Sequence, residues 1–143
     1  LRTLGVDGNP RDGAISALKA AQRMAVKLDE LNALLKDDLP APLRIGIGIH
    51  AGAAIVGEMG YSHAISVTAI GDTVNTSSRL EAKTKDFGAQ LIFSEHVAEL
   101  GGLDSSSLRH EEIEVRGRKE AMQIIVMEDA KDLMEMTDAK VTP

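Results

Sequence analysis

Apolar residues recur at helical spacing along residues 13–36, with Lys and Gln side chains between them. The positions that share this spacing are Leu18, Ala21, Ala25, Leu28, Leu31 and Leu35. The pattern predicts a helix with one apolar face, and the alanines in its first half allow close packing against a sheet. Asp12 is a candidate N-cap for this helix, and Pro40 follows its end.

A strict alternation follows in the stretch LRIGIGIHAG, residues 43–52. The two sides of the predicted strand carry different residues: Ile45, Ile47 and Ile49 on one, and Gly46, Gly48 and His50 on the other. The isoleucine side is expected to face a core. Because glycine inside a strand is costly, we expect another part of the chain to approach the glycine side closely.

The rest of the chain alternates short strands with helices. Extended chain is predicted at 53–60 and 64–70, a helix at 72–85, a strand at 89–94, a brief helix at 95–100, and two strands within 110–129 that are joined at 117–119. Asp72 and Ser94 are candidate caps of the two helices. This order predicts an α+β fold with helices on one face of a mainly antiparallel sheet. The polar tail is expected to be a frayed helix or disordered.

Composition excludes several classes of function. The chain has 143 residues, enough for one domain, and no Cys, so disulfides and thiolate metal sites are excluded. A net charge of −6 and 2% aromatic residues argue against nucleic-acid binding, although a few arginines can still bind a small anion. No apolar run has the length of a membrane span, and we expect no membrane contact by this segment. The chain opens without Met, and we interpret it as part of a longer protein.

Asn75 and Arg79 are the main candidates for a binding site. They lie four residues apart and therefore share one face of the predicted helix, within about two turns of its N-terminus, where free N–H groups favour an anion. Arg offers a bidentate fork to phosphate, and Asn offers both a donor and an acceptor. We expect the two side chains to project into a cleft sized for a nucleoside triphosphate. The alternative is a solvated helix face with Arg79 paired to a nearby Glu, and the residues alone favour neither.

Thr68, Arg116 and Arg118 are weaker candidates. Thr68 lies at the end of the strand before this helix, where its hydroxyl can read a base edge, although an ordinary β-branched strand residue is the commoner explanation. Arg116 and Arg118 flank Gly117 at the predicted hairpin tip, from which a guanidinium can reach a phosphate. Solvated charge at a hairpin tip is the commoner explanation for both.

The histidines favour a structural role over a catalytic or metal-binding one. His50 ends the alternating strand, but no Ser or Cys nucleophile motif accompanies it, so a packed and hydrogen-bonded histidine is favoured over a general base. His63, His96 and His110 have no metal-ligand spacing.

Two stretches resemble the catalytic domain of class III adenylyl/guanylyl cyclases: RIGIGIHAGAAIVGEMG, and TAIGDTVNTSSRLEAKTKDFGAQLIFSE after it. The resemblance runs over about 43–95, and EIEVRGRKEAMQIIV is similar, more loosely, to the closing hairpin of that family. The overall pattern is most similar to bacterial adenylate cyclases. It implies a ferredoxin-like cyclase fold, truncated at its N-terminus, with residues 1–128 as the C-terminal part of the catalytic domain and 129–143 as a polar tail.

The resemblance implies a lyase reaction that converts ATP to 3′,5′-cyclic AMP and pyrophosphate in signal transduction. It assigns Asn75 to the ribose, Arg79 to the reacting phosphate and Thr68 to the purine, where Thr goes with adenine. Arg116 falls where the family usually has a Lys that contacts the terminal phosphates. Arg118 is the alternative register for that contact.

The resemblance also implies two Mg²⁺ or Mn²⁺ ions and a head-to-tail dimer of cyclase domains. The two Asp ligands of the metals are expected upstream of Leu1, so no metal ligand is assigned within this chain. The isolated segment is then expected to be inactive and to self-associate, as a cytoplasmic domain of a parent that can be membrane-anchored. The alternatives are a guanylate cyclase, a regulatory pseudo-cyclase that binds nucleotide without turnover, and a non-catalytic α+β interaction module.

Overall fold

The computed structural model describes residues 8–61, 63 and 66–133, so the tail expected after 129 lies largely outside the described residues. The elements follow in this order: α1 (Pro10–Leu34), β1 (Ile47–Ile49), β2 (Ile55–Met59), β3 (Ser66–Ile70), α2 (Asp72–Asp86), β4 (Leu91–Ser94), α3 (Glu95–Leu100), β5 (Arg109–Ile113), β6 (Met122–Met127) and the 3₁₀ helix η1 (Ala130–Leu133). Every predicted helix and strand within the described range is present, with shifted boundaries.

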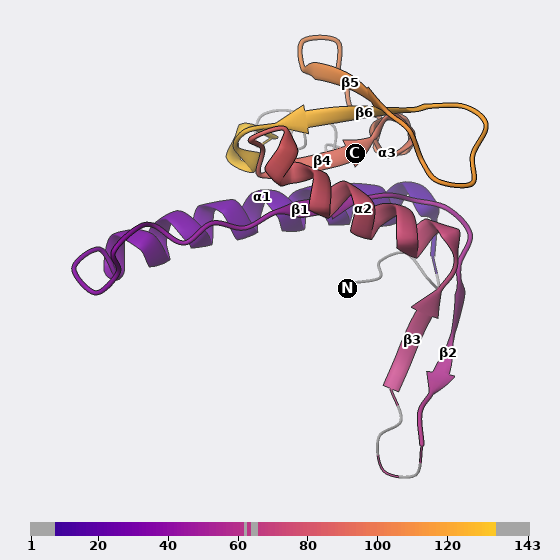
Figure 1. The fold of residues 1–143 in the computed structure, drawn as a ribbon, viewed down its shortest axis with the longest axis horizontal. Coiled ribbons are helices and arrows are strands. Elements are labelled where there is room, and N and C mark those ends of the chain that lie inside the picture. Colours follow the sequence, from indigo (N-terminus) through magenta and orange to yellow (C-terminus); the bar gives the residue numbers. More distant parts are fainter. Residues whose placement is uncertain (1–7, 62, 64–65, 134–143) are drawn as a thin grey trace.

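The strands form one four-stranded sheet and one separate hairpin. The sheet has the order β1-β4-β6-β5, in which β1 and β4 are parallel and the other two pairings are antiparallel. Strands β2 and β3 pair only with each other in the described structure, and their hairpin projects away from the sheet (Figure 1). The hairpin and α2 together form the crossover that a parallel pair requires. The predicted α+β class with a mainly antiparallel sheet is confirmed.

Helices cover both faces of the sheet, whereas the order of elements along the chain predicted them on one. On one face, α1 and α3 pack against Phe93 and Ile125. On the other, Leu80 of α2 packs against Ile92 and Ile124. All four residues of β4 are buried, which is typical of a strand covered on both sides. Its uninterrupted apolar run was the signal for this second helical layer.

Helix α1 begins earlier than predicted. Asn9, not Asp12, is the N-cap: its side-chain oxygen accepts from the Arg11 N–H at 2.9 Å, and Pro10 takes the first helical position, which needs no N–H donor. The predicted apolar face is buried through Ala25, after which the helix extends beyond the sheet (Figure 1). Leu34, its last residue, is 79% exposed.

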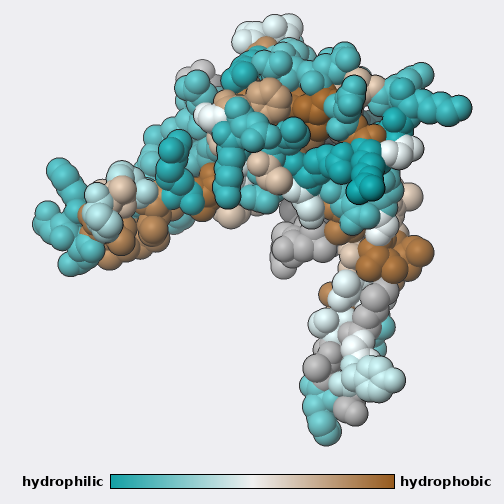
Figure 2. Space-filling model, in the orientation of Figure 1, coloured by the Kyte–Doolittle hydropathy of each residue, from teal (hydrophilic) through white to brown (hydrophobic). Residues whose placement is uncertain are grey.

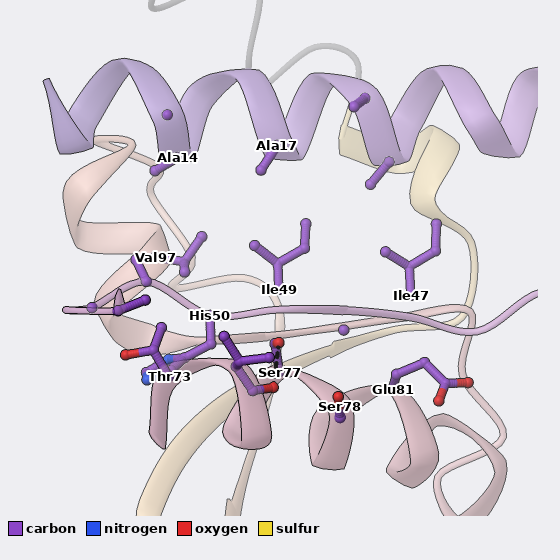
Figure 3. Close-up of a pocket in the computed structure, with 18 of the residues that line it drawn as sticks. Ala14, Ala17, Ile47, Ile49, His50, Thr73, Ser77, Ser78, Glu81 and Val97 are labelled. Carbon is purple, nitrogen blue, oxygen red and sulfur yellow. Dashed lines mark hydrogen bonds between the residues drawn. The ribbon is translucent and has the colours of Figure 1, made fainter. Parts of the chain in front are cut away.

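The glycine side of β1 lies directly against α2, as predicted. A Cβ atom at Gly48 would clash with the backbone nitrogen of Glu81 and the backbone oxygen of Ser77. A Cβ atom at Gly46 would clash with the Thr84 hydroxyl. On the opposite side of the strand, Ile47 and Ile49 point toward α1 (Figure 3). The two glycines therefore let α2 rest on the backbone of β1.

Replacing Gly48 with Ala tests this contact. We expect Gly48→Ala to lower the free energy of unfolding by about 1–3 kcal/mol, because the helix backbone must move away from the strand. The measurement is urea unfolding followed by circular dichroism. Gly57→Ala is the matched control, since nothing lies within 4 Å of a Cβ atom there and Gly57 is also a strand glycine. Equal losses in the two variants would contradict the close contact.

Candidate functional site

The N-terminus of α2 has no side-chain cap in the described part of the chain. Gly71 is its N-cap, in a left-handed conformation with φ of 137°, and its carbonyl accepts from the Asn75 N–H at 3.2 Å. Asp72 was expected to cap the helix but is instead its first residue, and no described side chain caps this end. The first turn therefore retains the partial positive charge of uncapped N–H groups.

Asp72, Asn75 and Arg79 form one stripe along α2. Their spacing of three and then four residues places them on the same side of the helix. The buried side of α2 carries different residues, Thr76, Leu80 and Thr84. Asn75 is exposed and Arg79 is half-buried, so both side chains are accessible. The structure thus confirms that the amide and the guanidinium share one open face.

The cleft expected around Asn75 and Arg79 stays a prediction. A cavity of about 680 Å³ lies between α1, β1 and α2, and neither Asn75 nor Arg79 lines it. Ser77, Ser78 and Glu81 line it from α2, opposite the alanines of α1 (Figure 3). Ser77 and Glu81 are each two residues from Arg79 and therefore lie on roughly the opposite side of the helix, against β1, so the cavity and the stripe are separate features.

Arg116 and Arg118 differ in the contacts that they make. The Arg118 guanidinium donates to the Asp72 carboxylate at 3.4 Å, which brings the tip of the β5–β6 connection to the end of the stripe. Arg116 is exposed and makes no hydrogen bond or ion pair with any described residue. Gly117, with φ of 89°, makes the turn between them. Sequence reasoning left the choice between the two arginines open; the contact with α2 belongs to Arg118.

Thr68 lies on the projecting hairpin rather than on α2. It pairs with Gly57 across the two strands, is half-buried, and its hydroxyl lies 3.3 Å from that of Ser66. The structure does not bring it into hydrogen-bond contact with Asn75 or Arg79. Thr68 belongs to the segment that leads directly into α2, but its role as a reader of the purine stays a prediction.

His50 is a packed strand-end histidine, as expected. Its Nδ1 atom lies 2.9 Å from the hydroxyl of Ser94, which is buried at the end of the neighbouring strand β4. Ser94 stands at the N-cap position of α3 but makes no capping bond with its side chain, because the hydroxyl is directed to His50. Burial is the largest cause of the lowered pKa of His50. The positive charges of Arg118 and His96 lower this pKa further, and the negative charge of Asp72 opposes them.

Neither a metal centre nor a membrane span is found in the described residues. Among them, no group of three or more His, Cys, Asp or Glu side chains is arranged to hold a metal ion. No helix within the described ranges combines the length and the apolar character needed to cross a bilayer.

The lowered pKa of His50 predicts acid sensitivity. Because the folded pKa lies below the ordinary value of 6.5, the unfolded chain binds more protons between those two values. We expect the free energy of unfolding to fall as the pH drops through 6.5 and to level off, for this group, below the folded pKa. Urea titrations across this range measure the slope, and His50→Asn, which keeps a polar group near the position of Nδ1, should remove it. An unchanged slope in this variant would contradict the assignment.

Comparison with known proteins identifies the family. A family model described as "Adenylate and Guanylate cyclase catalytic domain" matches residues 4–128. The chain is 38% identical over 116 residues to an adenylate cyclase of Anabaena cylindrica, covering 76% of this chain and 23% of that protein. It is 36% identical over 78 residues to adenylate cyclase 1 of Rhizobium meliloti (strain 1021), covering 54% of this chain and 12% of that protein. The chain thus spans less than a quarter of the length of either relative.

Solved structures show the same fold. The guanylyl cyclase Cya2 superimposes with a TM-score of 0.72 at 24% identity, covering 86% of this chain and 61% of that one. The adenylyl cyclase CyaB from P. aeruginosa superimposes with a TM-score of 0.66 at 23% identity, covering 82% of this chain and 59% of that one. These likenesses show the fold, and the family match over residues 4–128 shows that the chain belongs to the adenylate and guanylate cyclase catalytic domains.

Proposed function

We propose that this chain supplies the substrate-positioning side of an adenylate cyclase active site, which converts ATP to 3′,5′-cyclic AMP and pyrophosphate in the intact protein. The observation that carries the proposal is the open stripe on α2. Asn75 and Arg79 project from one face near an uncapped helix end, and Arg118 reaches the same end from the β5–β6 connection. An amide and two guanidinium groups around one helix end form a donor set suited to a sugar and a polyphosphate.

Each group has a separate task in this reaction. The ribose 3′ oxygen attacks the α-phosphorus and loses its proton to solvent, and the bond from that phosphorus to the pyrophosphate oxygen breaks, so that pyrophosphate leaves. The Asn75 carboxamide holds the ribose so that the 3′ oxygen faces the phosphorus. The Arg79 guanidinium meets the negative charge that grows on the reacting phosphate. Arg118, or Arg116 after a movement of its loop, binds the terminal phosphates.

The divalent ions of this chemistry are not assigned to the described residues. Mg²⁺ and Mn²⁺ prefer oxygen ligands such as clustered carboxylates, and no such group of three is found in the described ranges.

Adenine is favoured over guanine because Thr68 occupies the purine-selecting position that the resemblance assigns. A guanylate cyclase and a nucleotide-binding pseudo-cyclase are the nearest alternatives, and a non-catalytic interaction module is a third. An assay that measures both cyclic nucleotides distinguishes them: cyclic GMP alone indicates the first, and nucleotide binding without product indicates the second. Absence of nucleotide binding indicates the third.

A dimer is part of the proposal, since the stripe is open and the β2–β3 hairpin has no partner in the described structure. The hairpin exposes large apolar side chains: Ile55, Val56, Tyr61, Val67 and Ile70. Apolar surface is visible near its base and along α1 (Figure 2). A two-stranded hairpin is marginally stable by itself. A second cyclase domain packed on it would cover this surface and close the stripe into a site.

Alanine substitutions at the stripe test the catalytic proposal. We expect Asn75→Ala and Arg79→Ala each to lower kcat for cyclic AMP formation by the intact protein by about 10²–10³-fold, as expected for loss of a preorganised donor. Folding should be retained because neither side chain belongs to the core. Lys83→Ala is the control, since Lys83 lies on the same helix in an exposed ion pair with Asp86. Full activity in both stripe variants would refute the assignment.

A charge in the hairpin tests the dimer. Val67 is 72% exposed and lies opposite Glu58, so Val67→Lys keeps a favourable cross-strand pair while removing apolar surface. We expect this variant to weaken self-association at least about tenfold, measured by light scattering over a concentration series. Leu31→Lys, on the exposed part of α1, is the comparison and should change association less. A wild type that stays monomeric at high concentration would contradict the proposal.

A further inference from the structure

The contact between Arg118 and Asp72 joins two segments that are 46 residues apart. The base of the β5–β6 connection is held by buried Val115, which belongs to the same apolar cluster as Leu80 of α2. The Arg118 N–H donates to the Val115 carbonyl at 3.0 Å and closes the turn. The side chain of Arg118 then extends to the first residue of α2. The connection is therefore fixed at its base, and its tip is directed toward the stripe by a single ion pair.

This ion pair is weak and accessible. The side chains of Arg118 and Asp72 are 44% and 66% exposed, and one N–O distance of 3.4 Å joins them. Exposed pairs of this kind contribute little to stability because water competes for both charges. A polyanion that approaches the stripe can therefore take the place of the carboxylate at little cost.

Asp72 occupies the place where an anion would bind. It is the first residue of α2, at the positive end of the helix dipole, and it begins the stripe that continues with Asn75 and Arg79. A carboxylate and a phosphate accept from a guanidinium in the same manner. The field of Arg118 also reaches His50 at the end of β1, since it contributes to lowering the pKa of that residue. The Arg118 charge thus lies among the residues around the helix end.

We propose that Asp72 is a positioning residue that holds Arg118 at the end of the stripe and is displaced from it by the polyphosphate of the nucleotide. Before binding, Asp72 directs the guanidinium toward the helix end and neutralises part of its charge. On binding, Arg118 exchanges the carboxylate for phosphate oxygens, and the freed carboxylate opposes the incoming anion. The inference rests on the proposed function, because it requires that a polyphosphate binds at this stripe.

The test is a double-mutant cycle in the intact protein, with ATP, tripolyphosphate and adenosine as probes in calorimetry without divalent metal. We expect Asp72→Asn to tighten the binding of ATP and tripolyphosphate by about three- to tenfold, because a competing and repelling charge is removed. Adenosine, which carries no phosphate, should bind unchanged, whereas a merely structural role of Asp72 would alter all three probes alike. In an Arg118→Ala background the gain from Asp72→Asn should fall by at least about half, since there is no guanidinium left to release.

Asp86→Asn is the matched control. Asp86 lies at the other end of α2, its side chain is 65% exposed, and it forms an ion pair with Lys83 at 3.3 Å, so its removal breaks a similar pair at the end of the helix opposite the Arg118 contact. We expect it to leave the affinity for all three probes unchanged.

Three outcomes would overturn the inference, and they separate it from the proposed function. If ATP binding depends on Arg79 but Asp72→Asn leaves it unchanged or weakens it, the exchange of the Asp72 carboxylate for phosphate is wrong and the proposed site stands. If the gain persists undiminished without Arg118, Asp72 acts only as a repelling charge, and the exchange is wrong. If the wild type binds neither ATP nor tripolyphosphate, both the inference and the proposed function fail.

Discussion

The packing of α2 against the glycine side of β1 is the constraint on which the candidate site depends. With no Cβ atoms at Gly46 and Gly48, the backbone of the helix rests on the strand around Ser77 and Glu81. This contact fixes the rotation of α2 about its own axis, because the side that faces β1 and the side that faces the apolar cluster at Leu80 are both determined. The remaining side, which carries Asn75 and Arg79, can only face outward. A larger residue at Gly46 or Gly48 would therefore rotate α2, and with it Asn75 and Arg79.

Two further contacts hold the first turn of α2. The Thr73 hydroxyl donates to the Ala53 carbonyl at 2.7 Å, which ties the helix end to the chain that leaves β1. Asp72 meets Arg118 from the other direction. The short Thr73 hydrogen bond and the long Asp72 ion pair differ in role: the first positions the helix, and the second involves a guanidinium that stays available to a ligand. An open helix end held firmly on one side and loosely on the other is suited to binding an anion without moving its donors.

The sequence predicted the elements of this site well because local spacing determines them. Asn75 and Arg79 lie four apart on any regular helix, and the glycine alternation of β1 required a close neighbour. The second helical layer was missed because order along the chain does not show which face of a sheet a helix covers, although the unbroken apolar run of β4 was a signal. The choice between Arg116 and Arg118 was beyond sequence reasoning, since a left-handed glycine turn breaks the alternation that would have assigned each side chain to a face. The cavity was also missed, because it depends on the distance between α1 and α2, which are far apart in sequence.

The charge of the chain explains why local geometry must decide binding. A net charge of −6 repels a polyanion at long range, so general electrostatic attraction cannot bring a nucleoside triphosphate to this protein. At physiological ionic strength, interactions between exposed charges fade over about 8 Å, and only groups within roughly that distance of the phosphates contribute. Arg79, Arg118 and the uncapped end of α2 are such groups, gathered on one surface of an otherwise acidic chain. Selectivity for phosphate then follows from the placement of a few donors, and the carboxylate of Asp72, set among them, adjusts how strongly they act.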